Sequence, residues 1–282
     1  MAYIVVYEDQ PMRNYVISLS NESQRRKHIH TEFTKEGLVF EFFDAITPIT
    51  LSSTALDLGI TVDKTDLHPN EISCILSHVC LWKKAVDEKL DYIAIFEDDI
   101  YLGNSAQFFL KNSQWISEQC EIVKLETLYR KVFLSRKDEP LTLENKRELV
   151  VLNGPHMGAG GYILSRRAAE SLIDFTARLS ELIPIDHIIF RAYPEESHQK
   201  IYQLSPALCI QDVILTDGET NFPSSLEEVR NIRKGEIKVK KKLSLRAKAQ
   251  RELGRPFLQI LSFIQIGIWF FQGKKVTKIK FK

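Results

Sequence analysis

The chain has 282 residues, of which 44% are apolar and 27% are charged, and its formal net charge is +1. This length and apolar fraction are sufficient for a hydrophobic core, which excludes a small core-less or disordered protein. They allow one large domain or two modest ones. The charge is uneven, because residues 230–282 contain 16 Lys or Arg against 2 Glu. An acidic body is therefore followed by a strongly basic tail.

Cysteine usage and hydropathy indicate a cytoplasmic protein without a membrane span. The four cysteines form no CxxC pair and have apolar neighbours, as reduced buried thiols do: Cys74, Cys80, Cys120 and Cys209. The first residues, MAYIVVYEDQP, do not resemble a secretory signal. The longest apolar stretch, residues 256–271, contains two Gln and is shorter than the roughly 20 residues that a spanning helix needs.

The first half of the chain predicts alternating strands and helices. Residues 14–19 form a buried strand, and the polar residues 20–29 begin a helix. Residues 38–46 predict a second strand that ends at Asp44. Residues 68–89 repeat apolar side chains at the i, i+3, i+4, i+7 spacing of a helix. The apolar run at 91–96 is typical of a strand buried on both faces.

The second half continues this alternation, without an internal repeat. The expected elements are strands at 120–128 and 148–152, a glycine turn and strand at 158–165, helices at 166–179 and 184–193, and extended chain at 200–211. This order favours an α/β sandwich around a mostly parallel sheet. Ligands of such sheets bind beyond the carboxyl ends of the strands, where Ser18, Leu19, Asp44, Ala45 and the acids after residue 96 are expected.

Three adjacent carboxylates, Glu97, Asp98 and Asp99, follow the buried strand. A solvated turn would explain them, but Ile100, Tyr101 and Leu102 come directly afterwards. A divalent cation would remove their mutual repulsion, and carboxylate oxygens suit Mg²⁺ or Mn²⁺ bound together with a substrate phosphate. The pattern favours a site for metal and phosphate.

Six segments in register resemble glycosyltransferase family 25, the bacterial lipopolysaccharide and lipooligosaccharide galactosyltransferases. They are NYVISLSNESQRRKHI, EFFDAI, NEISCILSHVCLWKKAV, YIAIFEDDIYL, HMGAGGYILSRRAAESLI and PID, between about Arg13 and Asp212. The resemblance implies a GT-A-like single domain over residues 12–229, after an extension at 1–11. It also implies a UDP-sugar donor and a metal held through a DxD-like motif.

That motif reads EDD here, which leaves Asp99 as the safer metal ligand and Glu97 as the second. Asp98 is expected at the donor ribose or sugar, where a carboxylate also tolerates a cationic sugar. Arg25 and Arg26 begin a helix, where arginine can bind phosphate, although an exposed basic face would explain either residue equally well.

The resemblance adds further residues to the donor site. Leu19, Ala45, Ser77, His78, His156 and Gly160 are expected to line it, and Asp44 is expected to bind the base or ribose. Some of these residues have a simpler alternative: Asp44 as a helix cap or turn acid, His78 as a surface or packed histidine, and the glycines as tight turns. The motif GPHMGAGG lacks the Lys-Ser/Thr ending of a phosphate loop and precedes a strand, so a P-loop is not expected.

Asp186 is the expected acceptor-side residue, as general base or as a ligand of acceptor hydroxyls. Its alternative is an N-terminal helix acid stabilised by the helix dipole. The next candidates for the base are Glu126 and Asp212.

The resemblance implies an inverting, metal-dependent galactosyltransferase that forms a β-linkage on lipooligosaccharide. A glucosyltransferase or another hexosyltransferase is the near alternative. A metal-dependent phosphohydrolase or nuclease would need further Asp or His ligands, and the seven histidines are scattered. A nucleic-acid-binding protein is not expected, because the body is acidic and has no recognition motif.

The tail at 230–282 is predicted to be a basic amphipathic helical segment that binds anionic lipid of the inner membrane. Basic residues flank the apolar stretch on both sides, and Trp269 and Phe270 suit a headgroup boundary. The alternative is a terminal helix packed on the body. The expected location is the cytoplasmic face of the bacterial plasma membrane.

Overall fold

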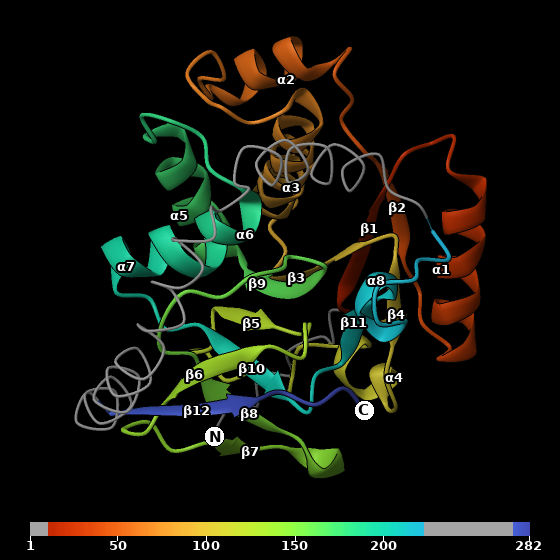
Figure 1. The fold of residues 1–282 in the computed structure, drawn as a ribbon, viewed down its shortest axis with the longest axis vertical. Coiled ribbons are helices and arrows are strands. Elements are labelled where there is room, and N and C mark those ends of the chain that lie inside the picture. Colours follow the sequence, from red (N-terminus) through yellow and green to blue (C-terminus); the bar gives the residue numbers. More distant parts are fainter. Residues whose placement is uncertain (1–10, 223–272) are drawn as a thin grey trace, which may run out of the picture.

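A computed structural model describes residues 11–222 and 273–282 of the chain (Figure 1). Its main sheet has eight strands in the order β2-β1-β3-β9-β5-β10-β8-β7. Their bounds are β1 (Arg13–Ser18), β2 (Glu41–Asp44), β3 (Tyr92–Glu97), β5 (Ile122–Lys124), β7 (Leu141–Thr142), β8 (Glu148–Val151), β9 (Gly161–Ser165) and β10 (Tyr202–Ser205). Within this sheet β8 and β9 run opposite to the other strands, which confirms the predicted mostly parallel sheet.

Two strand pairs and the helices complete the described part. β4 (Ile100–Leu102) pairs with β11 (Cys209–Gln211), and β6 (Lys131–Ser135) pairs with β12 (Lys274–Lys278). The helices are α1 (Ser23–Lys35), α2 (Leu51–Leu58), α3 (Pro69–Asp87), α4 (Ala106–Leu110), α5 (Arg166–Ala177), α6 (Ile185–His187), α7 (Tyr193–Ser197) and α8 (Asp212–Leu215), with a 3₁₀ turn η1 (Glu144–Lys146) and a π turn η2 (Ile188–Ala192).

The central strands are buried on both faces because helices cover both sides of the sheet. Ile93 and Ile95 of β3 pack into one core with α3 and α5, whereas Ala94 and Phe96 pack into a second core with α1 and α4. Successive side chains of a strand point to opposite faces, so a continuous apolar run fills both cores. This explains why β3 shows no polar alternation.

The start of α3 is fixed by its own sequence. The His68 ring accepts a hydrogen bond from the Asn70 N–H, and the Glu71 carboxylate accepts one from the His68 N–H. Pro69 occupies the first turn, where its missing N–H costs nothing. This capping box sets the helix that forms one wall of the cavity described below.

The C-terminal segment differs from the expected helical tail where the structure describes it. Residues 274–278 form β12, which pairs antiparallel with β6. The Ile279 carbonyl accepts from the Thr127 hydroxyl at 2.8 Å, and the Lys280 carbonyl accepts from the Ala207 N–H at 2.6 Å. The last residues therefore pack on the body. The rest of the predicted tail, 230–272, lies outside the described residues, as do residues 1–10 of the predicted N-terminal extension.

Across residues 11–222 and 273–282, no helix combines the length and the apolar character needed to cross a bilayer.

Candidate functional site

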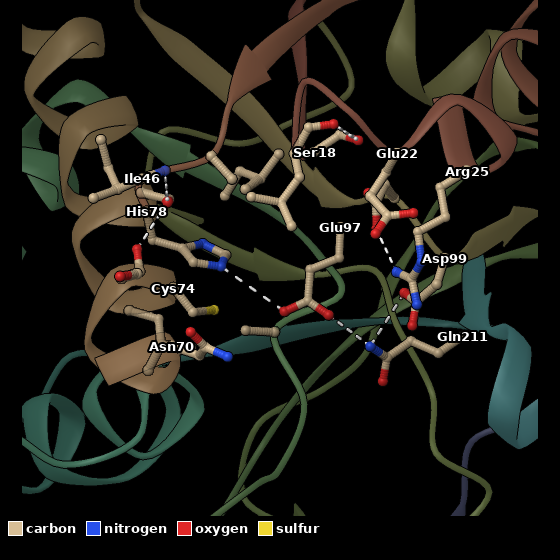
Figure 2. Close-up of a pocket in the computed structure, with 18 of the residues that line it drawn as sticks. Ser18, Glu22, Arg25, Ile46, Asn70, Cys74, His78, Glu97, Asp99 and Gln211 are labelled. Carbon is tan, nitrogen blue, oxygen red and sulfur yellow. Dashed lines mark hydrogen bonds and ion pairs between the residues drawn. The ribbon is translucent and has the colours of Figure 1, made fainter. Parts of the chain in front are cut away.

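A cavity of about 360 Å³ lies beyond the carboxyl ends of β1, β2 and β3 (Figure 2). The acidic turn after β3, the first half of α3, the turn at 158–159 and the end of β11 surround it. Most of the predicted site residues line it: Leu19, Arg25, Ala45, Ser77, His78, Glu97, Asp98, Asp99 and Asp186. The topology thus brings together residues that lie far apart in the sequence.

The three adjacent carboxylates have different partners. Asp98 forms an ion pair with Arg25, whose Nη1 lies 2.5 Å from Asp98 Oδ1. Glu97 Oε2 accepts a hydrogen bond from Gln211 Nε2 at 2.6 Å, and the same nitrogen lies 3.4 Å from Asp99 Oδ1. Arg25 comes from α1 and Gln211 from β11, so distant elements offset the repulsion that the sequence concentrates here.

Glu97 and Asp99 fit the predicted metal site. Both present an oxygen to the single Gln211 nitrogen, so the two carboxylates converge on one point. Burial and the neighbouring Glu97 raise the pKa of Asp99 to about 8, so part of the repulsion between the carboxylates is not relieved. A hard divalent cation at this point would relieve it. Asp98 fits less well, because its carboxylate is paired with Arg25.

Ser77 acts on the chain that follows β2. Its hydroxyl accepts from the Ile46 N–H at 2.9 Å and donates to the Ser73 carbonyl at 2.8 Å. The side chain is buried, and it fixes the loop that carries Ala45 against α3. The predicted donor-site serine therefore shapes the cavity wall through its neighbour.

His78 lies one residue further along α3 and is fully buried. Its Nδ1 is 2.7 Å from the Tyr162 hydroxyl. Its Nε2 is 3.9 Å from Glu97 Oε1 (Figure 2). The ring therefore links the packed interior to the acidic turn.

Asp186 lines the cavity and holds the glycine turn. Its Oδ2 accepts from the Gly158 N–H at 2.9 Å, and its Oδ1 accepts from the His187 N–H at 3.0 Å. Gly158 has φ +83, and a Cβ there would lie 2.6 Å from Glu126 Oε2. Only glycine fits at position 158. The N–H group of Gly158 orients the Asp186 carboxylate.

Three predicted residues do not line the cavity. The Asp44 carboxylate pairs with Arg26 and is 70% exposed. Burial, and next the charge of Lys124, lower the pKa of His156 to about 4, so this buried ring is neutral. Gly160 donates its N–H to Glu126 Oε2 at 2.9 Å, which is a contact within the fold.

The two other candidates for the base, Asp212 and Glu126, make contacts within the fold. Asp212 accepts hydrogen bonds from Tyr101, Thr220 and Asn221. Glu126 is buried beside Lys124 and does not line the cavity. Asp186 is therefore the better placed of the three.

The cavity residues that sequence reasoning missed include Glu22, Asn70, Cys74 and Gln211. The helical spacing gave a signal for Asn70 and Cys74, because they precede His78 by two turns and one turn on the same face of α3. Gln211 offered no such signal, since it reaches the acids only through the pairing of β11 with β4.

Comparison with known proteins finds one family model and several relatives. Residues 12–189 match the model of "Glycosyltransferase family 25 (LPS biosynthesis protein)". The chain is 38% identical over 213 residues to the lacto-N-neotetraose biosynthesis glycosyltransferase LgtE of Neisseria gonorrhoeae, a match that covers 72% of this chain and 75% of that protein. It is 34% identical over 251 residues to the lipooligosaccharide biosynthesis protein lic2B of Haemophilus influenzae, covering 86% and 91%.

Among solved structures, a glycosyltransferase involved in glycosylation of the major capsid of PBCV-1 aligns with 77% of this chain and 96% of its own. The TM-score is 0.41 and the sequence identity is 7%.

Proposed function

The chain belongs to glycosyltransferase family 25, and on this premise we propose that it transfers a hexose from a UDP-sugar to a sugar of bacterial lipooligosaccharide or lipopolysaccharide. Galactose is the proposed hexose, with inversion and a β-linked product. The observation that carries the proposal is the shared cavity, which is lined by Glu97, Asp99, Arg25 and Asp186. Relatives named for lipooligosaccharide and lacto-N-neotetraose biosynthesis support the acceptor class.

The acidic turn and α1 form the proposed diphosphate side. Glu97 and Asp99 would hold a Mn²⁺ or Mg²⁺ ion, which when bound supplies positive charge for the leaving diphosphate. Arg25 lines the same side of the cavity, where a guanidinium suits phosphate oxygens. Its ion pair with Asp98 orients the guanidinium and keeps a carboxylate near the sugar, where positive charge develops during transfer.

Asp186 is the proposed general base. Its carboxylate accepts the proton of the acceptor hydroxyl while the hydroxyl oxygen bonds to the anomeric carbon, and UDP leaves with the electrons of the broken C–O bond. Attack opposite the leaving group inverts the anomeric centre, so an α-linked UDP-sugar gives a β-linked product. The N–H groups of Gly158 and His187 hold the carboxylate in one orientation.

The proposed acceptor is part of a membrane glycolipid, which gives the basic segment a role. Residues 230–272 are outside the described part of the chain, so this step rests on sequence alone. Lys and Arg near an anionic bilayer contribute about 1 kcal/mol each, and the apolar stretch at 256–271 would enter the headgroup boundary. Binding at the inner membrane would keep the cavity near its acceptor.

A panel assay tests the proposal. The purified protein is incubated with UDP-galactose, UDP-glucose or UDP-N-acetylglucosamine, with or without truncated lipooligosaccharide, and UDP release and product mass are measured. We expect acceptor-dependent UDP release with UDP-galactose, loss of it in chelator, and loss of it in Asp99→Asn even with Mn²⁺. Full activity in chelator contradicts the metal role. If UDP is released only from UDP-glucose, the transferred sugar is glucose and not galactose. If UDP is released from every UDP-sugar without an acceptor, the protein is a phosphohydrolase.

A further inference from the structure

A hydrogen-bonded chain of two fully buried side chains, Trp82 and then Tyr162, ends at the His78 ring. Trp82 Nε1 donates to the Tyr162 hydroxyl oxygen at 3.0 Å, and that oxygen lies 2.7 Å from His78 Nδ1. Trp82, Tyr162 and His78 are each 0% exposed. Polar groups buried this deeply are almost always hydrogen-bonded, so the bonds among these groups decide where the protons are.

The inventory of donors fixes the tautomer of the ring. The Trp indole is only a donor, so the Tyr162 oxygen accepts from Trp82. The Tyr162 proton then has His78 Nδ1 as its acceptor among the described residues. If Nδ1 carried the ring proton instead, two N–H groups would point at one oxygen and the tyrosine proton would be left buried without an acceptor. Such a group is costly, and its cost favours the Nε2–H tautomer by roughly 5- to 150-fold.

The Nε2–H group then faces the cavity and the acidic turn. Nε2 has no hydrogen-bond partner in the described structure, and Glu97 Oε1 lies 3.9 Å from it. That distance exceeds a hydrogen bond, so the contact is that of an N–H dipole facing a carboxylate. The other oxygen of Glu97 accepts from Gln211. One N–H group therefore faces each oxygen of this carboxylate (Figure 2).

We propose that His78 is a positioning residue for Glu97: Trp82 and Tyr162 impose its Nε2–H tautomer, and that N–H orients the carboxylate at the proposed metal site. Partners that orient a metal ligand change metal affinity by roughly 10- to 100-fold when they are removed. The effect on sugar transfer rests on the proposed function. The tautomer and the binding of Mn²⁺ are measured with neither donor nor acceptor.

The spacing of three side chains near the cavity suggests an alternative, a zinc site. Cys74, His78 and Glu97 each offer a ligand atom, and these atoms lie within 4.8 Å of one another. A zinc ion would accept such a set. It requires a lone pair on Nε2, however, where the tyrosine bond places the proton. Zinc uptake is therefore an outcome that would contradict the proposal.

Two substitutions of His78 separate positioning from packing. In His78→Gln the amide nitrogen can take the place of the donating Nε2, whereas in His78→Asn the amide oxygen can take the place of the accepting Nδ1. Positioning of Glu97 predicts that Gln keeps the Mn²⁺ affinity within about 3-fold while Asn lowers it roughly 10- to 100-fold. A packing role as partner of Tyr162 predicts the reverse order. His30→Gln, an exposed histidine on α1, is the matched control.

The experiment uses the full chain in three measurements. Free Mn²⁺ is titrated by electron paramagnetic resonance, the unfolding midpoint of each variant is recorded, and ¹⁵N-labelled histidine reports the tautomer of His78 by NMR. We expect an Nε2–H signal in the wild type that loses its preference in Tyr162→Phe. An Nδ1–H ring in the wild type, equal or better Mn²⁺ binding in His78→Asn than in His78→Gln, or Zn²⁺ uptake that Cys74→Ser abolishes would each overturn the proposal. Normal NMR and Mn²⁺ results without sugar transfer would instead reject the proposed function.

Discussion

Arg25 and Asp98 form an ion pair of 2.5 Å in which each side chain is only 11% exposed. The second guanidinium nitrogen donates to the Phe222 carbonyl at 2.7 Å, so the pair also joins α1 and the acidic turn to the segment after α8. Removing one partner of such a pair leaves a charge that is poorly solvated.

Asp98→Ala should therefore lower the free energy of unfolding by about 3–5 kcal/mol. Urea denaturation in chelator measures this without the metal site contributing. Asp57→Ala, which removes an exposed carboxylate from α2, is the control and should stay within about 0.5 kcal/mol of the wild type. Equal stability of the two variants would mean that the Arg25–Asp98 pair adds nothing to the fold.

Asp186→Asn should reduce kcat by roughly 10²- to 10⁴-fold, because an amide cannot accept the acceptor proton. One of the two backbone bonds to the carboxylate is also lost, so a decrease in stability of about 1 kcal/mol is expected. The affinity for UDP, measured by calorimetry, should change little, and Asp174→Asn on the exposed face of α5 controls for charge. Normal turnover would place the base elsewhere.

Asp99 makes the metal-free protein less stable as pH rises. Its carboxyl group has a pKa of about 8 in the fold, against 3.8 for the ordinary side chain. Between these values the folded state binds more protons than the unfolded state, so the free energy of unfolding falls with rising pH. Urea denaturation in chelator at pH 5, 6, 7 and 8 should show this slope, and Asp99→Asn should flatten it. Parallel curves for the two proteins would show that Asp99 does not titrate in this window.

Gly158→Ala should destabilise the protein more than Gly59→Ala. Both glycines have positive φ, at +83 and +66, so both substitutions carry backbone strain of about 1 kcal/mol. A Cβ at Gly158 would also meet Glu126, whereas nothing lies within 4 Å of one at Gly59. Thermal unfolding compares the variants, and kcat should fall only in Gly158→Ala because that turn orients Asp186. An equal loss of stability in the two variants would mean that backbone strain alone explains the effect of Gly158→Ala.

The membrane prediction needs a deletion that spares β12. Replacing residues 231–271 by a short Gly/Ser linker keeps the pairing of β12 with β6. The variant should still act on a short soluble acceptor but should no longer sediment with anionic vesicles, and raised salt should release the full-length protein. The matched control keeps the segment but removes part of its charge, by Gln in place of Lys238, Lys240, Lys241 and Lys242. Sedimentation of the linker variant equal to that of the full chain would contradict the prediction.

Long regular elements were predictable because their signal is local. β3 contributes side chains to both cores, so its residues are continuously apolar. α3 contributes to one core, so its apolar residues repeat with the helical period. β4 has three residues and exists through its pairing with β11, so no local pattern marks it. β12 lies in a basic segment whose composition favoured a helix, and the partner that makes it a strand is β6.

The candidate site shows the same division. Glu97, Asp99 and Arg25 were predictable as residues at element ends that share a sheet edge. Asp44 and Ala45 are adjacent, yet only Ala45 lines the cavity, because consecutive side chains at a strand end point in different directions and Asp44 pairs with Arg26. Gln211 and the Trp82–Tyr162–His78 chain depend on contacts between distant segments, which one sequence does not reveal.

The contact between Thr127 and Ile279 has a consequence for how the chain is made. These residues are 152 positions apart, and β12 can join β6 only after everything between them has left the ribosome. Until then β6 presents an unpaired edge to other nascent chains, which is a known route to aggregation. Contacts of such separation also form slowly, because a long loop must close first. Chains arrested before residue 274 should therefore depend on chaperones far more than completed ones.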